Sequence, residues 1–401
     1  MGAIKTVNLI YAISFLDLFA VGLTFPLVGN YLRDIGASHT TVGLISSTYS
    51  AVQVLSGPFI GGWSDVRNRK SVLKFTIVIC ALCYALLGIT RSIIFITAVR
   101  CVLGLFKHTQ SICKAVITDL VPLKEQNEFF ARSAAVASFG FIIGPFVGGH
   151  ISEFENGFTY VCLFTGMLFI INYGCACYLP DDRKTTKPGD VSWKMVTNEF
   201  KKSIKEIKDI DWKVHWDTFL LKFLLGLTIT VYFSNQAIYL KETFHLSQKH
   251  IGYMISFFST VGVISGLFLK KIDNFLNTDI YSKMSLWFGV LALCFISLYL
   301  SPNIFIFMFF LIPLSVAASA MRVTSMELMF QKIEALHRGS FSGASNSVMS
   351  IARFMTPLFT GLTSDIFNEK SVMLIAVVPA CLGVFVSIFT KTKYKANVKN
   401  K

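Results

Sequence analysis

Charged residues are scarce in this sequence. They make up 15% of its 401 residues, against about a quarter in an ordinary soluble domain. Acidic residues are the scarcer kind, with 23 Asp and Glu against 37 Lys and Arg, whereas hydrophobic residues reach 53% and include 38 Phe. The low charge excludes an ordinary soluble domain, and the composition favours an integral membrane protein whose main partner is the lipid bilayer.

Motifs of membrane enzymes are also missing. The sequence has no H-x-E-x-x-H-like metal pattern, no H-x-x-x-x-D acyltransferase pattern and no Walker loop. Its nine cysteines lie in apolar segments without companion ligands, as buried free thiols do. We therefore expect no enzyme activity, no metal, no cofactor and no direct use of ATP.

Apolar runs of about 20 residues, the length that a helix needs to cross hydrocarbon, recur along the chain. They predict an all-α integral membrane fold of twelve transmembrane helices, at 5–31, 40–63, 71–90, 93–118, 129–151, 158–179, 217–240, 249–270, 279–300, 304–329, 340–364 and 371–390.

A long polar stretch separates these spans into two groups of six. Isoleucines recur in its second half at helical spacing, which indicates a short interfacial helix. The predicted organisation is an N-terminal six-helix bundle at 1–179, a basic cytoplasmic linker at 180–216, a C-terminal six-helix bundle at 217–390 and a basic cytoplasmic tail at 391–401.

The two halves resemble each other in sequence. VGLISSTYSAVQVLSG at 42–57 aligns with IGYMISFFSTVGVISG at 251–266, an offset of 209 residues. GPFVGGHISE at 144–153 aligns with TPLFTGLTSD at 356–365, an offset of 212 residues. A parallel repeat of this kind predicts two pseudo-symmetric bundles that rock around a central substrate site.

The basic residues are distributed unevenly between the two sides of the predicted membrane. With both termini inside, 26 Lys and Arg lie on the cytoplasmic side and five on the outer side. The positive-inside rule favours this orientation. The net charge of +14 is therefore a topology signal, and we expect no nucleic-acid partner.

GGWSDVRNRKSVL, in the loop after the second span, resembles the pattern G-x-L-a-D-R-x-G-R-K-x-x-L of major facilitator superfamily transporters. Gly61, Asp65 and Arg69 match it, and Asn68 stands in place of a glycine. The resemblance implies a conformational latch that stabilises the outward-open state, in which Asp65 faces the N-terminus of helix eleven and Arg69 pairs with Asp119 on helix four.

GFIIGPFVGG resembles the G-x-x-x-G-P-x-x-G-G pattern of helix five in proton-coupled antiporters of this superfamily. Within the family, the chain is similar to a metazoan branch and, more distantly, to the tetracycline–proton antiporters. A transmembrane helix can contain Pro and Gly, because neighbouring helices supply partners for the freed backbone groups. Glycines four residues apart lie on one face and allow a second helix to approach closely. The predicted hinge and seal consist of Gly140, Gly144, Pro145, Gly148 and Gly149, with Pro357 and Gly361 as their second-half counterparts.

Ionisable residues inside a membrane are expensive and mark functional sites. Asp17 lies near the middle of the first span, where the related antiporters carry an acid, and is predicted to carry protons. His108 is a second candidate for proton coupling, because histidine is the side chain whose unperturbed pKa is nearest to neutral pH, and a hydrogen-bonded packing histidine is the alternative.

The fourth span carries three cations seven residues apart. This spacing places Arg100, Lys107 and Lys114 on one face of a continuous helix, together with Ser111. We expect Arg100 and Lys107 to face the central cavity with Ser111, and Lys114 to extend toward the cytoplasm. In the second half, Arg353, Asn235 and Gln236 are candidate substrate contacts.

One deep acid, Asp17, against three deep cations, Arg100, Lys107 and Arg353, predicts a cationic cavity. The hypothesis is a monomeric secondary transporter that moves a small organic anion or drug-like compound by alternating access in exchange for protons. Alternatives are an uncoupled facilitator, an exporter of amphiphilic cations, and a non-transporting scaffold or sensor. The sequence leaves open which membrane holds the protein.

Overall fold

The computed structural model describes the chain except for residues 1, 123–124, 181–209, 277, 333–337 and 400–401. Its described elements are helices. The first half contains α1 (Gly2–Asp34), α2 (His39–Val66), α3 (Arg69–Ile89), α4 (Ile93–Phe106), α5 (Thr109–Leu120), α6 (Gln126–Ile151) and α7 (Gly157–Cys177). The second half contains α9 (Trp216–Phe244), α10 (Gln248–Leu276), α11 (Ile280–Leu300), α12 (Ile304–Gln331), α13 (Arg338–Ile366), η2 (Glu369–Ser371), α14 (Val372–Ile375) and α15 (Val377–Lys399).

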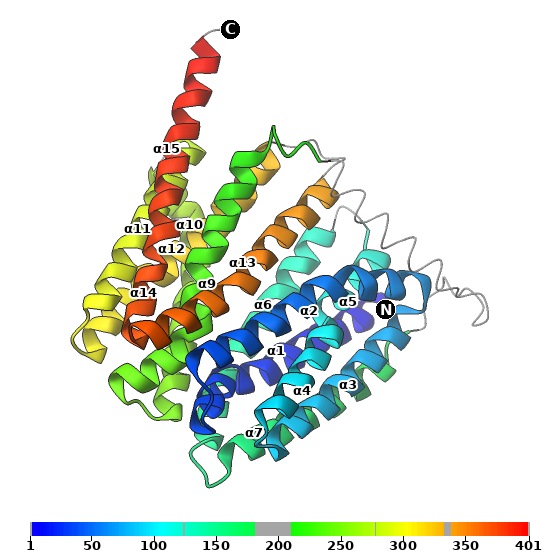
Figure 1. Cartoon of the computed structure of the whole chain (residues 1–401). Coiled ribbons are helices and arrows are strands. Elements are labelled where there is room, and N and C mark those ends of the chain that lie inside the picture. The colour runs from blue at the N-terminus through cyan, green and yellow to red at the C-terminus, as the bar shows by residue number, and fades with distance from the viewer. Residues whose placement is uncertain (1, 123–124, 181–209, 277, 333–337, 400–401) are drawn as a thin grey trace. The chain divides into compact units, whose positions relative to one another are not determined.

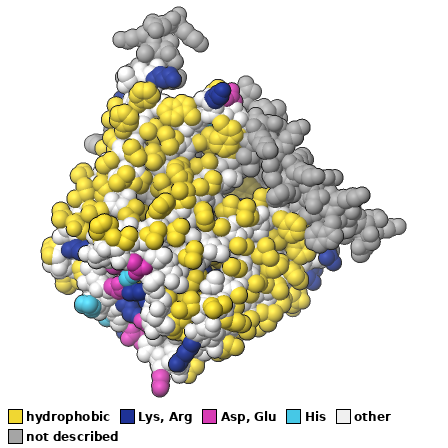
Figure 2. Space-filling view, in the orientation of Figure 1, with side chains coloured by type: hydrophobic (Ala, Val, Ile, Leu, Met, Phe, Trp, Pro, Cys, Tyr) yellow, Lys and Arg dark blue, Asp and Glu magenta, His cyan; other side chains and the backbone are white. Residues whose placement is uncertain are grey.

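Each predicted span coincides with one helix or with a run of consecutive helices. Among the described residues, ten helical segments are long and apolar enough to cross a membrane. The other two predicted spans are α2 and α13, of 28 and 29 residues, which carry more polar side chains. Hydrophobic side chains cover most of the face visible in Figure 2, and charged side chains lie mainly near its edges. The all-α membrane fold is therefore confirmed.

The predicted linker at 180–216 and its interfacial helix lie almost entirely outside the described residues. The predicted basic tail at 391–401 is helical as far as Lys399, where α15 ends.

Contacts within the chain define two compact units. Unit 1 comprises Met1–Ala37, Thr48–Ile204 and Leu246–Ser256, and unit 2 comprises Ser38–Ser47, Lys205–His245 and Phe257–Lys401. The units follow the two predicted halves except at two helix ends: the first turns of α2 belong to unit 2, and the first turns of α10 belong to unit 1. In unit 1, α1 packs against α6 and α7; in unit 2, α9 packs against α13.

Glycines of α6 allow it to approach α1 closely within unit 1. A Cβ atom at Gly140 would lie 2.6 Å from the Phe15 carbonyl oxygen, and one at Gly148 would lie 2.4 Å from the carbonyl oxygen of Leu23. Because the obstructing atoms belong to the backbone, no side-chain rotation would make room. The glycine spacing of the helix-five motif therefore permits the packing of α6 on α1.

The repeat produces two equivalent close contacts, one in each unit. A Cβ at Gly252 of α10 would lie 2.2 Å from the carbonyl oxygen of Pro145 in unit 1. A Cβ at Gly43 of α2 would lie 2.2 Å from the carbonyl oxygen of Pro357 in unit 2. Gly43 corresponds to Gly252 and Pro145 to Pro357 in the aligned halves. Each proline therefore lies against the glycine at the start of a helix from the other half.

The predicted fourth span is present as Ile93–Leu120, but it is not one continuous helix. The helix is interrupted between α4 and α5 at Lys107 and His108, where the backbone angles leave the helical region. Figure 1 draws α4 and α5 as two separate helices. The seven-residue spacing from Arg100 through Lys107 to Lys114 therefore does not define a single helix face, and Ser111 and Lys114 are exposed on α5.

Candidate functional site

A buried ion pair lies at the interruption between α4 and α5. Lys107 Nζ donates to Asp17 Oδ1 over 2.5 Å, and the two side chains are 7% and 0% exposed. Gln110 Nε2 donates to the other carboxylate oxygen, Asp17 Oδ2, over 2.9 Å. Asp17 therefore has both oxygens occupied by donors, one charged and one neutral, as a buried carboxylate requires.

The interruption is compensated by neighbouring side chains of α2. Breaking a helix frees backbone groups, which need new partners inside a membrane. Gln53 Nε2 donates to the Lys107 carbonyl oxygen over 3.1 Å. The His108 ring nitrogen Nε2 lies 2.8 Å from the hydroxyl of Ser56, which also donates to the Gly104 carbonyl oxygen. These bonds to α2 hold the unwound residues in place, and Lys107 is positioned to reach α1.

Arg100 lies on α4 beside an aromatic ring. Its guanidinium carbon is 4.2 Å from the ring centroid of Tyr49, the geometry of a cation–π contact. Its Nε atom is buried and has no hydrogen-bond partner among the described residues. A buried donor without a partner is costly, so this N–H is available to a ligand or a water molecule.

The second-half candidates occupy different environments. Asn235 is buried on α9 and donates to Glu369 Oε1 over 3.1 Å. Gln236 is 1% exposed, and neither of its amide atoms has a hydrogen-bond partner among the described residues. The hydroxyl of Tyr232, one turn earlier on α9, is equally unpaired. Arg353 is exposed on α13, and its guanidinium lies 3.4 Å from the hydroxyl of Ser350.

The predicted latch residues occupy the ends of α2, α3 and α5. Arg69 donates through Nε to Asp119, the partner that the family resemblance implied, and its guanidinium lies 2.8 Å from Asp65. A Cβ at Gly61 would meet nothing within 4 Å. Asn68, which replaces a glycine of the family pattern, has φ −55° and accepts from the backbone N–H of Lys70. The departure is therefore favourable, because this position needs an N-cap and not a left-handed residue.

Sequence reasoning missed the polar side chains that complete the site. Gln110 was a recognisable signal, since it follows Lys107 by three residues in an apolar span. Gln53 and Ser56 gave no such signal, because polar residues are frequent along α2. Their roles depend on the interruption at Lys107, which the apolar pattern of the fourth span concealed.

Comparison with known proteins identifies the family. The family model described as "Major Facilitator Superfamily" matches residues 9–357. The chain belongs to this superfamily. It is therefore a membrane transporter of small molecules and not an enzyme, in agreement with the prediction from its motifs.

Curated relatives and solved structures agree with this membership. The chain is 22% identical over 403 residues to the quinolone resistance protein NorA of Staphylococcus aureus (strain MSSA476), an alignment that covers 99% of each protein. It is 26% identical over 160 residues to the class H tetracycline resistance protein of Pasteurella multocida, which covers 39% of this chain and 40% of that protein. The structure of the human organic anion transporter MFSD10 (TETRAN) matches it with a TM-score of 0.68 at 17% identity, covering 96% of this chain and all of that one.

Proposed function

We propose that this transporter moves a small organic anion by alternating access and that Asp17 couples the movement to protons. The observation that carries the proposal is the ion pair between Lys107 and Asp17, buried at the interruption between α4 and α5. Lys107 is a cation that a substrate anion can use, and Asp17 is a carboxylate that a proton can neutralise.

The ion pair links proton binding to anion binding. When Asp17 is ionised it holds Lys107, and a substrate anion competes with it for the same ammonium group. A proton on Asp17 removes that competitor, so the proton and the anion each favour the binding of the other. The pair therefore supports movement of an anion together with a proton, whereas the sequence alone favoured exchange.

Unpaired polar groups supply further substrate contacts in each unit. Arg100 offers a buried N–H, and Gln236 and Tyr232 offer amide and hydroxyl groups that have no partner among the described residues. Buried groups of this kind lose little by binding a ligand, because they make no other hydrogen bond. The similarity to the structure of an organic anion transporter agrees with this substrate class.

A second candidate is an amphiphilic drug-like compound exchanged for protons. The curated relatives are named for resistance to quinolones and tetracycline, which favours export of such compounds. A cationic substrate competes with the proton for Asp17, and that competition produces exchange. The charge of the substrate therefore decides the direction of coupling at the same residue.

The distribution of basic residues supports one orientation of the chain in the membrane. Both termini lie in the cytoplasm, which places Arg69 and Asp119 on the cytoplasmic side. The functional unit is proposed to be a monomer, because the repeat supplies both bundles within one chain.

Transport into liposomes tests this proposal. The purified full chain is reconstituted, and uptake of a panel of organic anions and amphiphilic cations is measured with and without an inward proton gradient. We expect the gradient to accelerate uptake of an anion, and Lys107→Gln and Arg100→Gln to abolish it. Lys114→Gln is the matched control, because Lys114 is an exposed cation of α5.

Two results would overturn the proposal. One is normal anion transport in both Lys107→Gln and Arg100→Gln. The other is proton-dependent transport that persists in Asp17→Asn. A cation driven outward by an inward proton gradient would instead establish the second candidate.

A further inference from the structure

His39, the first residue of α2, lies among three carboxylates of unit 2. Its Nε2 atom is 2.9 Å from Glu242 Oε2 and 3.5 Å from Glu369 Oε2. Its Nδ1 atom is 3.0 Å from Asp365 Oδ1. One imidazole therefore has carboxylate oxygens at both of its ring nitrogens, contributed by α9, α13 and η2.

This arrangement needs a hydrogen or a metal ion between Nε2 and the facing carboxyl groups. A neutral imidazole has only one N–H, so its other nitrogen would direct a lone pair at a carboxylate oxygen. A proton on the ring, a proton on a facing carboxyl group or a metal ion bound by Nε2 and the carboxylates would each meet this need. Glu369, 4% exposed, accepts hydrogen bonds from Asn235 and Ser364, and the His39 ring compensates its charge only when that ring is protonated.

The distances fit a hydrogen bond from Nε2 to Glu242 and also allow a metal ion. Three ligand atoms, one each from His39, Glu242 and Glu369, lie within 4.8 Å of one another. Zinc binds nitrogen and carboxylate oxygen at about 2.0–2.2 Å, so tetrahedral ligand atoms are separated by about 3.3–3.6 Å. The 3.5 Å separation between Nε2 and Glu369 lies in that range, and the 2.9 Å separation between Nε2 and Glu242 is shorter. Small movements of the two glutamates would complete the geometry.

The other ring nitrogen has the partner that a metal ligand needs. Metal-binding histidines almost always donate their second N–H to a carboxylate or carbonyl oxygen, which fixes the tautomer. Asp365 accepts at Nδ1 and also receives the backbone N–H groups of His39 and Thr40, so its position is determined by the start of α2. Nε2 then faces Glu242 and Glu369.

Comparison of the two halves shows that the cap of α2 does not depend on the His39 imidazole. Glu153 corresponds to Asp365 and caps α10 in the same way, by accepting the Lys249 backbone N–H over 3.1 Å. The counterpart of His39 is Gln248, whose side chain accepts a hydrogen bond from Asn30. Capping therefore does not require a histidine, and the ring with its two glutamates is an addition found in unit 2.

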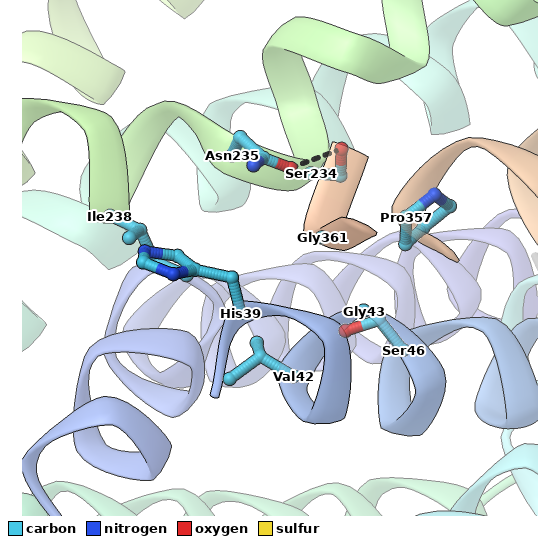
Figure 3. A pocket seen from close by; sticks show the side chains of 9 residues that line it. All are labelled: His39, Val42, Gly43, Ser46, Ser234, Asn235, Ile238, Pro357 and Gly361. Atoms are coloured by element: carbon cyan, nitrogen blue, oxygen red, sulfur yellow. Dashed lines mark hydrogen bonds between the residues drawn. The ribbon is translucent and has the colours of Figure 1, made fainter. Parts of the chain in front are cut away.

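We propose that His39, Glu242 and Glu369 bind a zinc ion, with Asp365 positioning the imidazole. The exposed part of Glu242, 31% of its side chain, gives access from solvent. His39 also lines a small cavity with Ser234, Asn235 and Gly361 (Figure 3).

Zinc binding to the purified full chain tests this proposal. Zn²⁺ is added at buffered free concentrations, and affinity and melting temperature are measured for the wild type, His39→Gln and Glu242→Gln. Glu153→Gln is the matched control, since it removes the equivalent cap acid of the other unit. We expect one site in the wild type and in Glu153→Gln, and affinity at least tenfold weaker in the two other variants.

Each outcome is decisive. Equal zinc affinity in the wild type and His39→Gln overturns the proposal, because the nine cysteines would then account for binding. Absence of zinc binding, together with a pH-dependent melting temperature that His39→Gln removes, shows that a proton occupies the position instead. Melting temperatures without zinc identify any variant that fails to fold, and Glu242→Gln provides the second test.

Zinc bound here would join the start of α2 to α9 and η2. If the first turns of α2 leave α9 during the cycle, zinc inhibits transport in the wild type but not in His39→Gln. This consequence rests on the proposed alternating access. The binding experiment does not, so failure of transport and failure of the zinc site are distinguishable.

Discussion

Lys107 Nζ lies 2.5 Å from Asp17 Oδ1, although ninety residues separate them in the sequence. The contact joins the middle of α1 to the interruption between α4 and α5, and both side chains are buried. A buried pair of this kind balances two desolvated charges, and each side chain depends on the other.

Removing one member of this pair should destabilise the protein more than removing both. Asp17→Asn leaves the Lys107 ammonium buried without a counter-charge, and Lys107→Gln does the same to the carboxylate, at about 3–5 kcal/mol each. The double variant leaves neither charge, so its loss of stability should be smaller than that of either single variant. Thermal unfolding of the four proteins in detergent measures this coupling, and strictly additive losses would contradict it.

A methyl group at Gly144 should separate α6 from α1. The Cβ of Gly144→Ala would lie 2.7 Å from Gly22 Cα, and such overpacking costs about 1–3 kcal/mol. We expect a lower melting temperature and impaired transport. Gly174→Ala on α7 is the control, because a Cβ there meets nothing within 4 Å and alanine favours helix by about 1 kcal/mol. An unchanged melting temperature in Gly144→Ala would exclude this packing role.

The Arg69–Asp119 pair should affect transport more than stability. The two side chains are 15% and 34% exposed, and pairs near the surface contribute about 1 kcal/mol or less to folding. If the pair is a conformational latch, Arg69→Ala slows transport several-fold while the melting temperature changes little. Arg132→Ala breaks the exposed pair with Glu128 and serves as the control. Equal transport rates in Arg69→Ala and Arg132→Ala would show that the Arg69–Asp119 pair is not a latch.

Substitution of Gln236 should weaken substrate binding without lowering stability. Its amide is buried without a hydrogen-bond partner among the described residues, so Gln236→Leu removes a desolvation cost and should leave the melting temperature equal or higher. If the amide binds substrate, the same variant raises the substrate concentration needed for half-maximal transport. Transport assays and thermal unfolding of one preparation measure both. A fall in stability with normal transport would indicate a structural role.

Glu153 should contribute stability that disappears in acid. The backbone N–H of Lys249 donates to its carboxylate and, with a bond from Ser247, holds the pKa of Glu153 below its ordinary value. Because the folded-state pKa is the lower one, this stabilisation is present above the unfolded pKa of about 4.3 and is lost as the pH falls through the folded-state pKa. The melting temperature of Glu153→Gln should therefore fall less than that of the wild type between pH 6 and pH 3. Glu155→Gln, in the same loop, should follow the wild type.

Several features of the fold could be predicted because they repeat along the chain. Apolar runs long enough to cross hydrocarbon mark the spans, and the motif around Asp65 and Arg69 marks the family. These signals are local in the sequence. The membrane requires long apolar helices, because every backbone group in hydrocarbon needs a partner within its own helix or in a neighbouring one.

The site could be predicted only in part. Asp17, Arg100 and Lys107 stand out because charge inside a span is expensive. The pairing of Asp17 with Lys107 did not follow from the sequence, since the regular seven-residue spacing of the cations suggested a continuous helix face. His39 gave no signal either, because it lies at the end of a span, where polar residues are ordinary.

The sequence by itself determined the number of spans, the repeat and the family, because hydrophobic length and motif spacing are properties of adjacent residues. Only the tertiary structure decided which charges meet. The interruption at Lys107 exists because side chains of α2 bond to the freed backbone and α1 supplies the carboxylate. The cluster around His39 likewise exists because the ends of distant helices come together, and those contacts are made in three dimensions.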